Sequence, residues 1–153
     1  MDQPDEAVRT VEAQVAMLLR LSERGRRSAA RRLGELERSA YLVLGVLDAA
    51  GPANVNAIAD ALRLDPSTMT RQVLAMEQAG HVVRRPDPTD GRATVVETTP
   101  AGRAALAATR EDRAQVYAEI LDGWSAGDRR TLAAMLSRLN QDLDGWGRRH
   151  SGR

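Results

Sequence analysis

Residues 65–80, with the sequence DPSTMTRQVLAMEQAG, decide how the chain is interpreted. Asp65 is a favoured N-cap residue, Pro66 suits the first position of a helix, and Gly80 is typical of a helix end. The exposed positions near the start of this predicted helix carry short hydrogen-bonding side chains and one long cation: Ser67, Thr68, Thr70 and Arg71. Such residues at a helix N-terminus are typical of a recognition helix, which contacts base edges and phosphates in the major groove.

Two shorter helices are expected before this recognition helix. One spans 39–50 and has Ser39 as its N-cap, and the other spans about 55–62 and has Asn54 as its cap. The predicted core of the helical segment consists of apolar side chains that can pack together: Ile58, Leu62, Leu64, Met69, Val73 and Met76.

A β-hairpin is predicted directly after the recognition helix. Residues 81–85 and 94–98 have the residue types and alternation of strands, and the turn-forming residues 86–91 separate them. Short helices followed by such a hairpin predict a winged helix-turn-helix, in which the hairpin is the wing.

Long amphipathic helices are expected at both ends of the chain. The first covers 5–24, a second begins at Thr99 and Pro100, and Ser125 with Asp128 resembles a capping box for the last. Their apolar stripes must be buried against something, and self-association buries them without a foreign partner. We therefore predict a mainly α fold with a small β-hairpin wing, a winged helix-turn-helix flanked by long N- and C-terminal dimerisation helices.

The expected organisation has three parts. Residues 1–35 form an N-terminal dimerisation helix and a basic connection, 36–99 the DNA-binding domain, and 100–153 the C-terminal dimerisation helices. The arginine-rich run over 24–32 fits either a solvated helical face or a phosphate-facing patch.

Composition excludes several classes of protein. The net charge of +1 over 153 residues argues against a globally basic nucleic-acid coat but leaves room for a local basic face. Without cysteine the chain has no disulfide, thiolate metal site or thiol switch. Its two histidines, His81 and His150, lie 69 positions apart, so no metal or other cofactor is expected. The N-terminus lacks the layout of a signal peptide, and no apolar run approaches the ~18 residues of a membrane helix. We therefore expect a cytoplasmic protein that does not contact membranes.

An enzyme is not expected, because no catalytic constellation is visible. Neither His81 nor His150 has a local acidic partner, and no cysteine is available as a nucleophile. Asp87 and Asp90 lie in a loop among arginines, where charge neutralisation explains them. The alternative to a DNA-binding regulator is a helical protein-interaction module without DNA binding.

Four motifs that occur in order resemble the MarR family of bacterial transcriptional regulators. They are PSTMTR at 66–71, EQAG at 77–80, DPTDGR at 87–92 and TPAG at 99–102. The most specific element is the wing motif Asp-x-Arg, here Asp90 and Arg92. Two positions depart from the pattern: Gln72 replaces a residue that is usually apolar, and Arg63 stands where many related motifs use Gly.

The resemblance implies a function and a mode of regulation. Members of this family are homodimers whose terminal helices interlock, and each subunit offers one winged helix-turn-helix to half of a palindromic operator. The resemblance also implies a repressor that a small ligand, often phenolic, releases from double-stranded DNA.

The side chains expected to bind DNA lie on the helices and on the wing: Ser39, Ser67, Thr68, Thr70, Arg71, Arg84, Asp90 and Arg92. Asp90 is expected to hold the guanidinium of Arg92 in a fixed direction toward the minor groove. Two alternatives remain open at this level. Ser67 and Thr68 can simply complete the helix cap, and Asp90 with Arg92 can form only a surface ion pair.

The ligand pocket implied by the resemblance lies between the dimer helices and the DNA-binding lobe. Leu21, Tyr41 and Leu44 are the residues that could line it. Tyr41 also fits a core position with a solvated hydroxyl.

Overall fold

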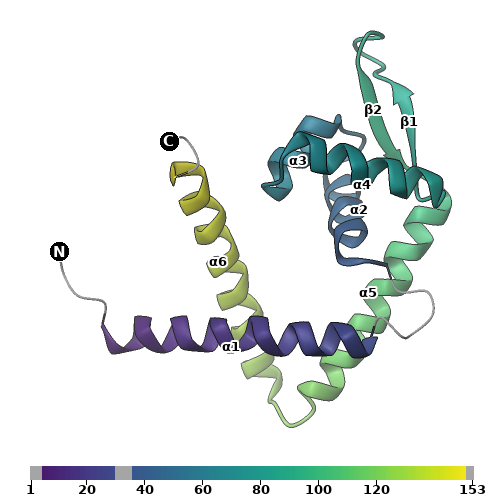
Figure 1. The fold of residues 1–153 in the computed structure, drawn as a ribbon. Coiled ribbons are helices and arrows are strands. Elements are labelled where there is room, and N and C mark those ends of the chain that lie inside the picture. Colours follow the sequence, from purple (N-terminus) through teal and green to yellow (C-terminus); the bar gives the residue numbers. More distant parts are fainter. Residues whose placement is uncertain (1–4, 30–35, 151–153) are drawn as a thin grey trace. The chain divides into compact units, whose positions relative to one another are not determined.

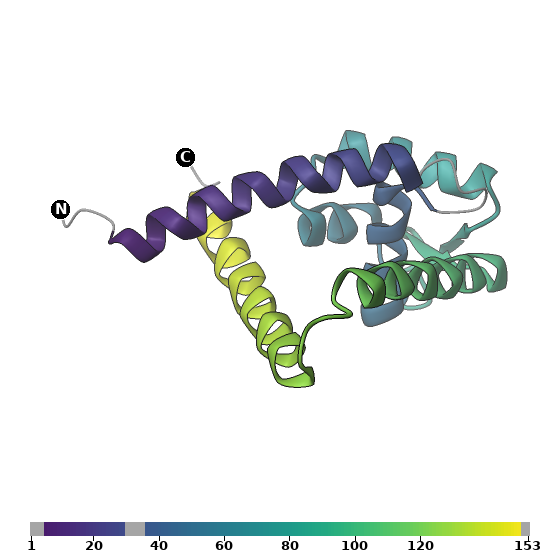
Figure 2. The same cartoon turned by 90° about the horizontal axis from the view of Figure 1, so that it is seen from below.

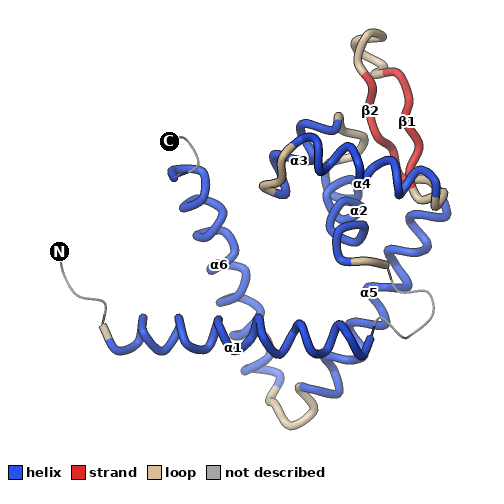
Figure 3. The backbone as a smooth tube through the Cα atoms, viewed as in Figure 1, coloured by secondary structure: helices blue, strands red, loops and turns tan. Residues whose placement is uncertain are grey.

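The computed structural model describes residues 5–29 and 36–150 (Figure 1). Figure 3 shows that the described strands belong to one hairpin and that the other elements are helices. The mainly α fold with a β-hairpin wing is therefore confirmed. The elements in chain order are α1 (Glu6–Ala29), α2 (Arg38–Ala50), α3 (Val55–Leu62), α4 (Pro66–Gln78), β1 (Val82–Pro86), β2 (Thr94–Thr98), α5 (Pro100–Ile120) and α6 (Ala126–His150).

The predicted N-caps are confirmed for α3, α4 and α6. The Asn54 side chain accepts a hydrogen bond from the Ala57 N–H at 2.8 Å, and Asp65 accepts one from the Thr68 N–H at 2.9 Å. Ser125 accepts a bond from the Asp128 N–H at 3.1 Å at the start of α6. These bonds satisfy donors that a helix leaves without internal partners, so each cap fixes where its helix begins.

The prediction that Ser39 caps α2 is wrong. The helix begins at Arg38, after Glu37, whose side chain makes no capping bond. The preceding residue, Leu36, is buried, and its N–H donates to the Thr109 hydroxyl on α5 at 3.4 Å. This long-range anchor fixes where the chain turns into the helix, and Ser39 falls within the first turn.

The core of the winged helix-turn-helix contains most of the predicted residues. Ile58, Met69, Val73 and Met76 are buried, and Leu62 packs against the cluster that they form. The prediction that Leu64 belongs to this core is wrong, because its side chain is 39% exposed. Other elements fill the space instead, through residues that the helical pattern alone did not include: Leu44, Leu47, Val82, Val96 and Leu106.

The exposure of Leu64 follows from the backbone of the preceding residue. Arg63 ends α3 in the left-handed conformation, with φ 56° and ψ 41°. That conformation turns the chain between α3 and α4 and directs Leu64 away from the core, although the Leu64 N–H still bonds to the Ala59 carbonyl at 3.0 Å. A residue with a side chain is disfavoured there by about 1–2 kcal/mol, which explains why glycine is common at this turn.

The wing is an antiparallel hairpin in which Val82 pairs with Thr98 and Pro86 pairs with Thr94. Its first strand begins one residue later than expected. Val96 in β2 also exchanges hydrogen bonds with Ala53, with N···O distances of 2.8 and 3.2 Å, in the segment between α2 and α3. The base of the wing is therefore held against the helices.

The end of α4, the base of the wing and the start of α5 meet at four residues, which we call the Thr99 junction: Gly80, His81, Thr99 and Gly102. The Thr99 N–H donates to the His81 carbonyl at 3.0 Å, and its hydroxyl donates to the Gly80 carbonyl at 2.6 Å. The same hydroxyl accepts a bond from the Gly102 N–H at 3.0 Å. A Cβ at Gly102 would lie 2.1 Å from the His81 carbonyl oxygen, so this close approach requires glycine.

The chain forms two compact units, residues 1–110 and 111–153. The boundary lies within α5, because Leu106 and Thr109 are buried in the first unit and Arg110 pairs with Asp48 of α2 at 2.8 Å. The Arg110–Asp48 pair joins α5 to α2, and the two helices lie next to each other in Figure 1 and cross in Figure 2. The expected boundary between a DNA-binding domain that ends at residue 99 and dimerisation helices that begin at residue 100 stays a prediction.

The terminal helices present uncovered apolar side chains in the described chain. On α1 these include Val8, Val11, Leu18 and Leu21, each about half exposed. Within α6 no described residue is buried, and its exposed apolar side chains are Met135, Leu136, Leu143 and Trp146. The side chains of the basic run 24–32 lie outside the described residues. In the part of the chain that is described, no helix is both long and apolar enough to cross a membrane.

We expect Gly102→Ala to destabilise the fold by about 3 kcal/mol, because the new methyl group would overlap the His81 carbonyl. Gly45→Ala in α2 is the matched control, since no atom lies within 4 Å of the position of its new Cβ. That change should stabilise by about 0.5–1 kcal/mol. Thermal unfolding measures both values. Equal stabilities of the two variants would contradict the close approach at the Thr99 junction.

Candidate nucleic-acid interface

The α4 helix has a buried face and an exposed face. Met69, Val73 and Met76 point into the core. The residues exposed on the opposite face include Ser67, Thr70, Arg71, Leu74 and Gln78. The exposed face is the one that a recognition helix would offer to the major groove.

Asp65 organises the first turn of α4. Its carboxylate accepts hydrogen bonds from the Ser67 hydroxyl, from the Thr68 N–H at 2.9 Å and from the Thr68 hydroxyl at 2.5 Å. These donors, with the Ser67 hydroxyl contributing most, hold the pKa of Asp65 far below its ordinary value. Ser67 and Thr68 thus complete the cap in this structure, and each hydroxyl oxygen keeps lone pairs that can accept a further bond.

The next two predicted residues differ in their surroundings. The Thr70 hydroxyl donates to the Pro66 carbonyl one turn earlier, at 2.8 Å. Arg71 is exposed and makes no ion pair with any residue that the structure describes. Its charge is therefore available to a phosphate or a base edge.

The wing tip corrects the expected role of Asp90. Its carboxylate accepts a hydrogen bond from the backbone N–H of Arg92 at 3.0 Å and does not hold the guanidinium. Nor does the guanidinium form an ion pair within the described ranges, so the predicted Asp90–Arg92 side-chain contact is wrong. The Asp90 carboxylate bonds to the backbone because the tight turn brings the N–H of the residue two positions later close to it.

Asp87 plays the same part at the beginning of the turn. It accepts bonds from the N–H and the hydroxyl of Thr89, both at 2.7 Å, and the hydroxyl bond is the main cause of its lowered pKa. The two carboxylates therefore shape the loop that presents Arg92.

The other two wing arginines are paired with carboxylates. Nη2 of Arg84 lies 2.9 Å from a carboxylate oxygen of Glu77 at the end of α4. Nε of Arg85 lies 3.0 Å from a carboxylate oxygen of Glu97 on β2. Sequence reasoning missed both pairs. The Arg85–Glu97 pair could have been found from the hairpin register, whereas the Arg84–Glu77 pair depends on how β1 packs against α4. The role of Arg84 in DNA binding stays a prediction.

Ser39 lies apart from α4 and the wing in sequence. It is half-buried in the first turn of α2, and its role in DNA binding stays a prediction.

The residues expected around a ligand differ in exposure. Leu44 has no exposed surface and belongs to the core, so it offers nothing to a ligand in this structure. Tyr41 is half-buried and packs against that core, whereas Leu21 is 54% exposed on α1. Tyr41 also lies within hydrogen-bonding reach of Arg110, whose pKa is raised mainly by its bond to Asp48 and further by Tyr41.

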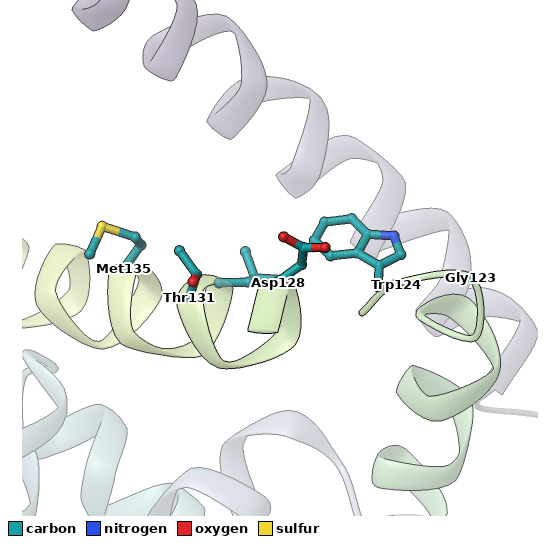
Figure 4. A pocket seen from close by; sticks show the side chains of 6 residues that line it. Gly123, Trp124, Asp128, Thr131 and Met135 are labelled. Atoms are coloured by element: carbon teal, nitrogen blue, oxygen red, sulfur yellow. The ribbon is translucent and has the colours of Figure 1, made fainter. Parts of the chain in front are cut away.

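Two open hollows lie elsewhere, in the second unit. One is formed at the α5–α6 turn and the start of α6 and includes Trp124, Thr131 and Met135 (Figure 4). The other lies along α6 beside Leu143 and Trp146. None of Leu21, Tyr41 and Leu44 lines either hollow. Within the described residues, no three His, Cys, Asp or Glu side chains group together as a metal site.

Comparisons with known proteins agree with this architecture. The family model described as MarR family matches residues 35–93. The HTH-type transcriptional regulator YxaD of Bacillus subtilis is 38% identical over 111 residues, which are 72% of this chain and 78% of that protein.

Solved structures show the same fold at lower identity. A MarR family protein from Bacillus stearothermophilus aligns with a TM-score of 0.76 at 21% identity, over 93% of this chain and 99% of that one. The PcaV transcriptional regulator of Streptomyces coelicolor was solved with its natural ligand. It aligns with a TM-score of 0.65 at 21% identity, over 92% of this chain and 98% of that one.

We expect the Asp65 carboxylate to stabilise the protein above its ordinary pKa of 3.8. Because folding lowers this pKa, the contribution is fully present at neutral pH and is lost as the pH falls below 3.8. Asp65→Asn keeps a capping oxygen without the charge, so its unfolding temperature should lie below that of the original protein at pH 7 and approach it in acid. A gap that stays constant from pH 7 to pH 3 would show that the ionised carboxylate is not responsible.

Proposed function

Because the chain belongs to the MarR family of transcriptional regulators, we propose that it is a homodimeric repressor that binds a palindromic operator and leaves it when a small molecule binds. The observation that carries the DNA contact is that the cations Arg71 and Arg92 form no ion pair within the described chain. One lies on the exposed face of the predicted recognition helix, and the other lies at the tip of the wing.

The two arginines are proposed to have different tasks. Arg71 follows the first turn of α4, within the part of a recognition helix that reaches base edges. Arg92 extends from the hairpin tip, where a narrow and electronegative minor groove would attract its guanidinium. The carboxylates of Asp87 and Asp90 accept bonds from the backbone of the loop, which holds Arg92 in place without neutralising it by direct pairing.

The proposed dimer rests on the terminal helices. The stripe that includes Val11 and Leu18 on α1 and the apolar side chains of α6 are uncovered within the described chain. A two-fold symmetric partner buries the same surfaces on both copies. In such a dimer the recognition helices would lie about 34–36 Å apart, which is one turn of DNA.

The proposed effector is a small phenolic molecule. Its position is suggested by Tyr41, which lies with Arg110 and Asp48 where α2 contacts α5. A phenol or a carboxylate in this place would compete for the same hydrogen bonds. The structural relative PcaV, which was solved with its natural ligand, supports a ligand-responsive mechanism for this chain as well.

We expect Arg92→Ala to weaken binding to operator and to random duplex alike, because its guanidinium is proposed to meet the groove and the backbone. The slope of log K against log salt should fall by about one unit for each phosphate that the protein no longer neutralises. Arg71→Ala should cost about 1–3 kcal/mol, mainly on the operator, if it contacts a base. Fluorescence anisotropy at several salt concentrations separates the two variants.

Arg85→Ala is the matched control for these measurements, because Arg85 is already paired with Glu97. It should change the salt slope less than Arg92→Ala does. An Arg92→Ala variant with unchanged DNA affinity would reject the proposed wing contact. Thermal unfolding should show all three variants to be nearly as stable as the original protein, since these side chains are exposed.

We expect the protein to be a dimer that does not persist as a folded monomer. Light scattering at micromolar concentration should give twice the mass of the chain. Replacing Leu143 by Asp should shift the mass toward the monomer, because a charge on an interface helix loses solvation when the helices meet. Leu42→Asp on α2, at a position 42% exposed and outside the predicted dimerisation helices, tests whether any added charge has this effect. A stable, folded monomer of the original chain would refute the dimer.

A further inference from the structure

Leu74 is an exposed leucine on the polar face of α4. Its side chain is 38% exposed, and it belongs to none of the buried clusters described above. Residues three and four apart share one face of a helix, so Leu74 lies beside Thr70, Arg71 and Gln78. The buried residues Val73 and Met76 lie on the other side of the helix.

Exposure alone does not give Leu74 a role, because single exposed leucines are common on protein surfaces. Its position distinguishes it from the other exposed leucines of this lobe. Leu64 is turned outward by the left-handed backbone of Arg63, and Leu42 lies on α2. Leu74 instead lies in the third turn of the helix that is proposed to enter the major groove.

The neighbouring hydroxyl groups are already engaged within the chain. Ser67 and Thr68 donate to Asp65, and Thr70 donates to the Pro66 carbonyl. The hydroxyl hydrogens of these three residues therefore already donate within the chain and are not available to a base edge. The remaining features of the exposed face are the charge of Arg71, the amide of Gln78 and the apolar surface of Leu74.

The major groove offers one apolar group to an apolar side chain. Adenine, guanine and cytosine present hydrogen-bonding edges, and only thymine adds a methyl group, at its C5 atom. A leucine that covers a polar base edge removes water from it without replacing the lost hydrogen bonds. A leucine that covers the thymine methyl buries two apolar surfaces against each other.

We propose that Leu74 is a specificity-determining residue that recognises the 5-methyl group of thymine in each half of the operator. The inference rests on the proposed function, because it requires α4 to lie in the major groove. It adds an apolar contact to the polar contacts expected from the sequence.

The experiment compares thymidine with deoxyuridine in the duplex. The base of deoxyuridine lacks only the 5-methyl group and keeps the same base-pairing edge. The probe is a duplex selected from a random library by the original protein, with its thymines then replaced by deoxyuridine one position at a time. Removing one buried methyl should weaken binding about fourfold, and removing it in both halves of a symmetric site about fifteenfold.

The Leu74→Ala variant should bind the thymine duplex more weakly and should lose nothing further on the deoxyuridine duplex at the sensitive position. Leu42→Ala is the matched control, because Leu42 is 42% exposed on another helix of the same lobe. It should keep the full preference for thymine. Arg71→Ala should bind both duplexes more weakly and keep the same ratio between them.

Two results would overturn the proposal while leaving DNA binding intact. One is equal affinity of the original protein for the thymine and deoxyuridine duplexes at every position. The other is a thymine preference in Leu74→Ala as large as in the original protein, since another residue or the shape of the DNA would then be responsible. Leu74→Gln, which keeps a helix-forming side chain of similar length, gives a second variant if Leu74→Ala unfolds.

A different result would remove the proposed function itself. If the original protein selects no duplex above its non-specific background, sequence-specific DNA binding fails, and the role of Leu74 fails with it. The outcome of the selection step thus distinguishes the failure of the proposed function from the failure of the methyl contact.

Discussion

The N–H of Thr99 donates to the His81 carbonyl, while its hydroxyl donates to Gly80 and accepts from Gly102. One residue thereby joins the end of α4, the base of the wing and the first turn of α5. Glycine at 102 allows the backbones to approach this closely. Because three elements share these bonds, the position of the proposed recognition helix relative to the wing follows from the geometry of the Thr99 junction. A displacement of the start of α5 would therefore disturb hydrogen bonds at the end of α4 and at the base of the wing.

On α4 and the wing, the charge available to a partner depends on which arginines are paired and not only on how many there are. Arg84 and Arg85 are bound to carboxylates from α4 and β2, whereas Arg71 and Arg92 are unpaired within the described chain. In the proposed complex, Arg71 on the helix and Arg92 on the wing are therefore the predicted DNA-binding arginines whose charge is not already paired with a carboxylate. In the proposed complex this pairing would limit the sequence-independent part of DNA binding, which grows with the number of phosphates that a protein neutralises.

The sequence predicted the features that local chemistry determines. The caps at Asn54 and Asp65 depend on residues three positions away, so their patterns are visible without a structure. The start of α2 could not be found in this way, because it depends on a bond between Leu36 and Thr109, which are 73 positions apart. The partner of Arg84 was missed although Glu77 lies only seven positions earlier. Its carboxylate comes from the preceding helix, and only the packing of the wing brings the two groups together.

Hydrogen exchange of backbone amides tests most directly whether the Thr99 junction joins α4, the wing and α5 into one cooperative unit. The His81 N–H donates to the Met76 carbonyl at the end of α4, and the Thr99 N–H donates to the His81 carbonyl across the junction. The Val73 N–H lies in the buried centre of α4. If the elements open together, the three amides should exchange with the same free energy of opening. If the amides of His81 and Thr99 exchange by local opening, their free energy of opening would be much lower than that of the Val73 amide. That result would contradict this account.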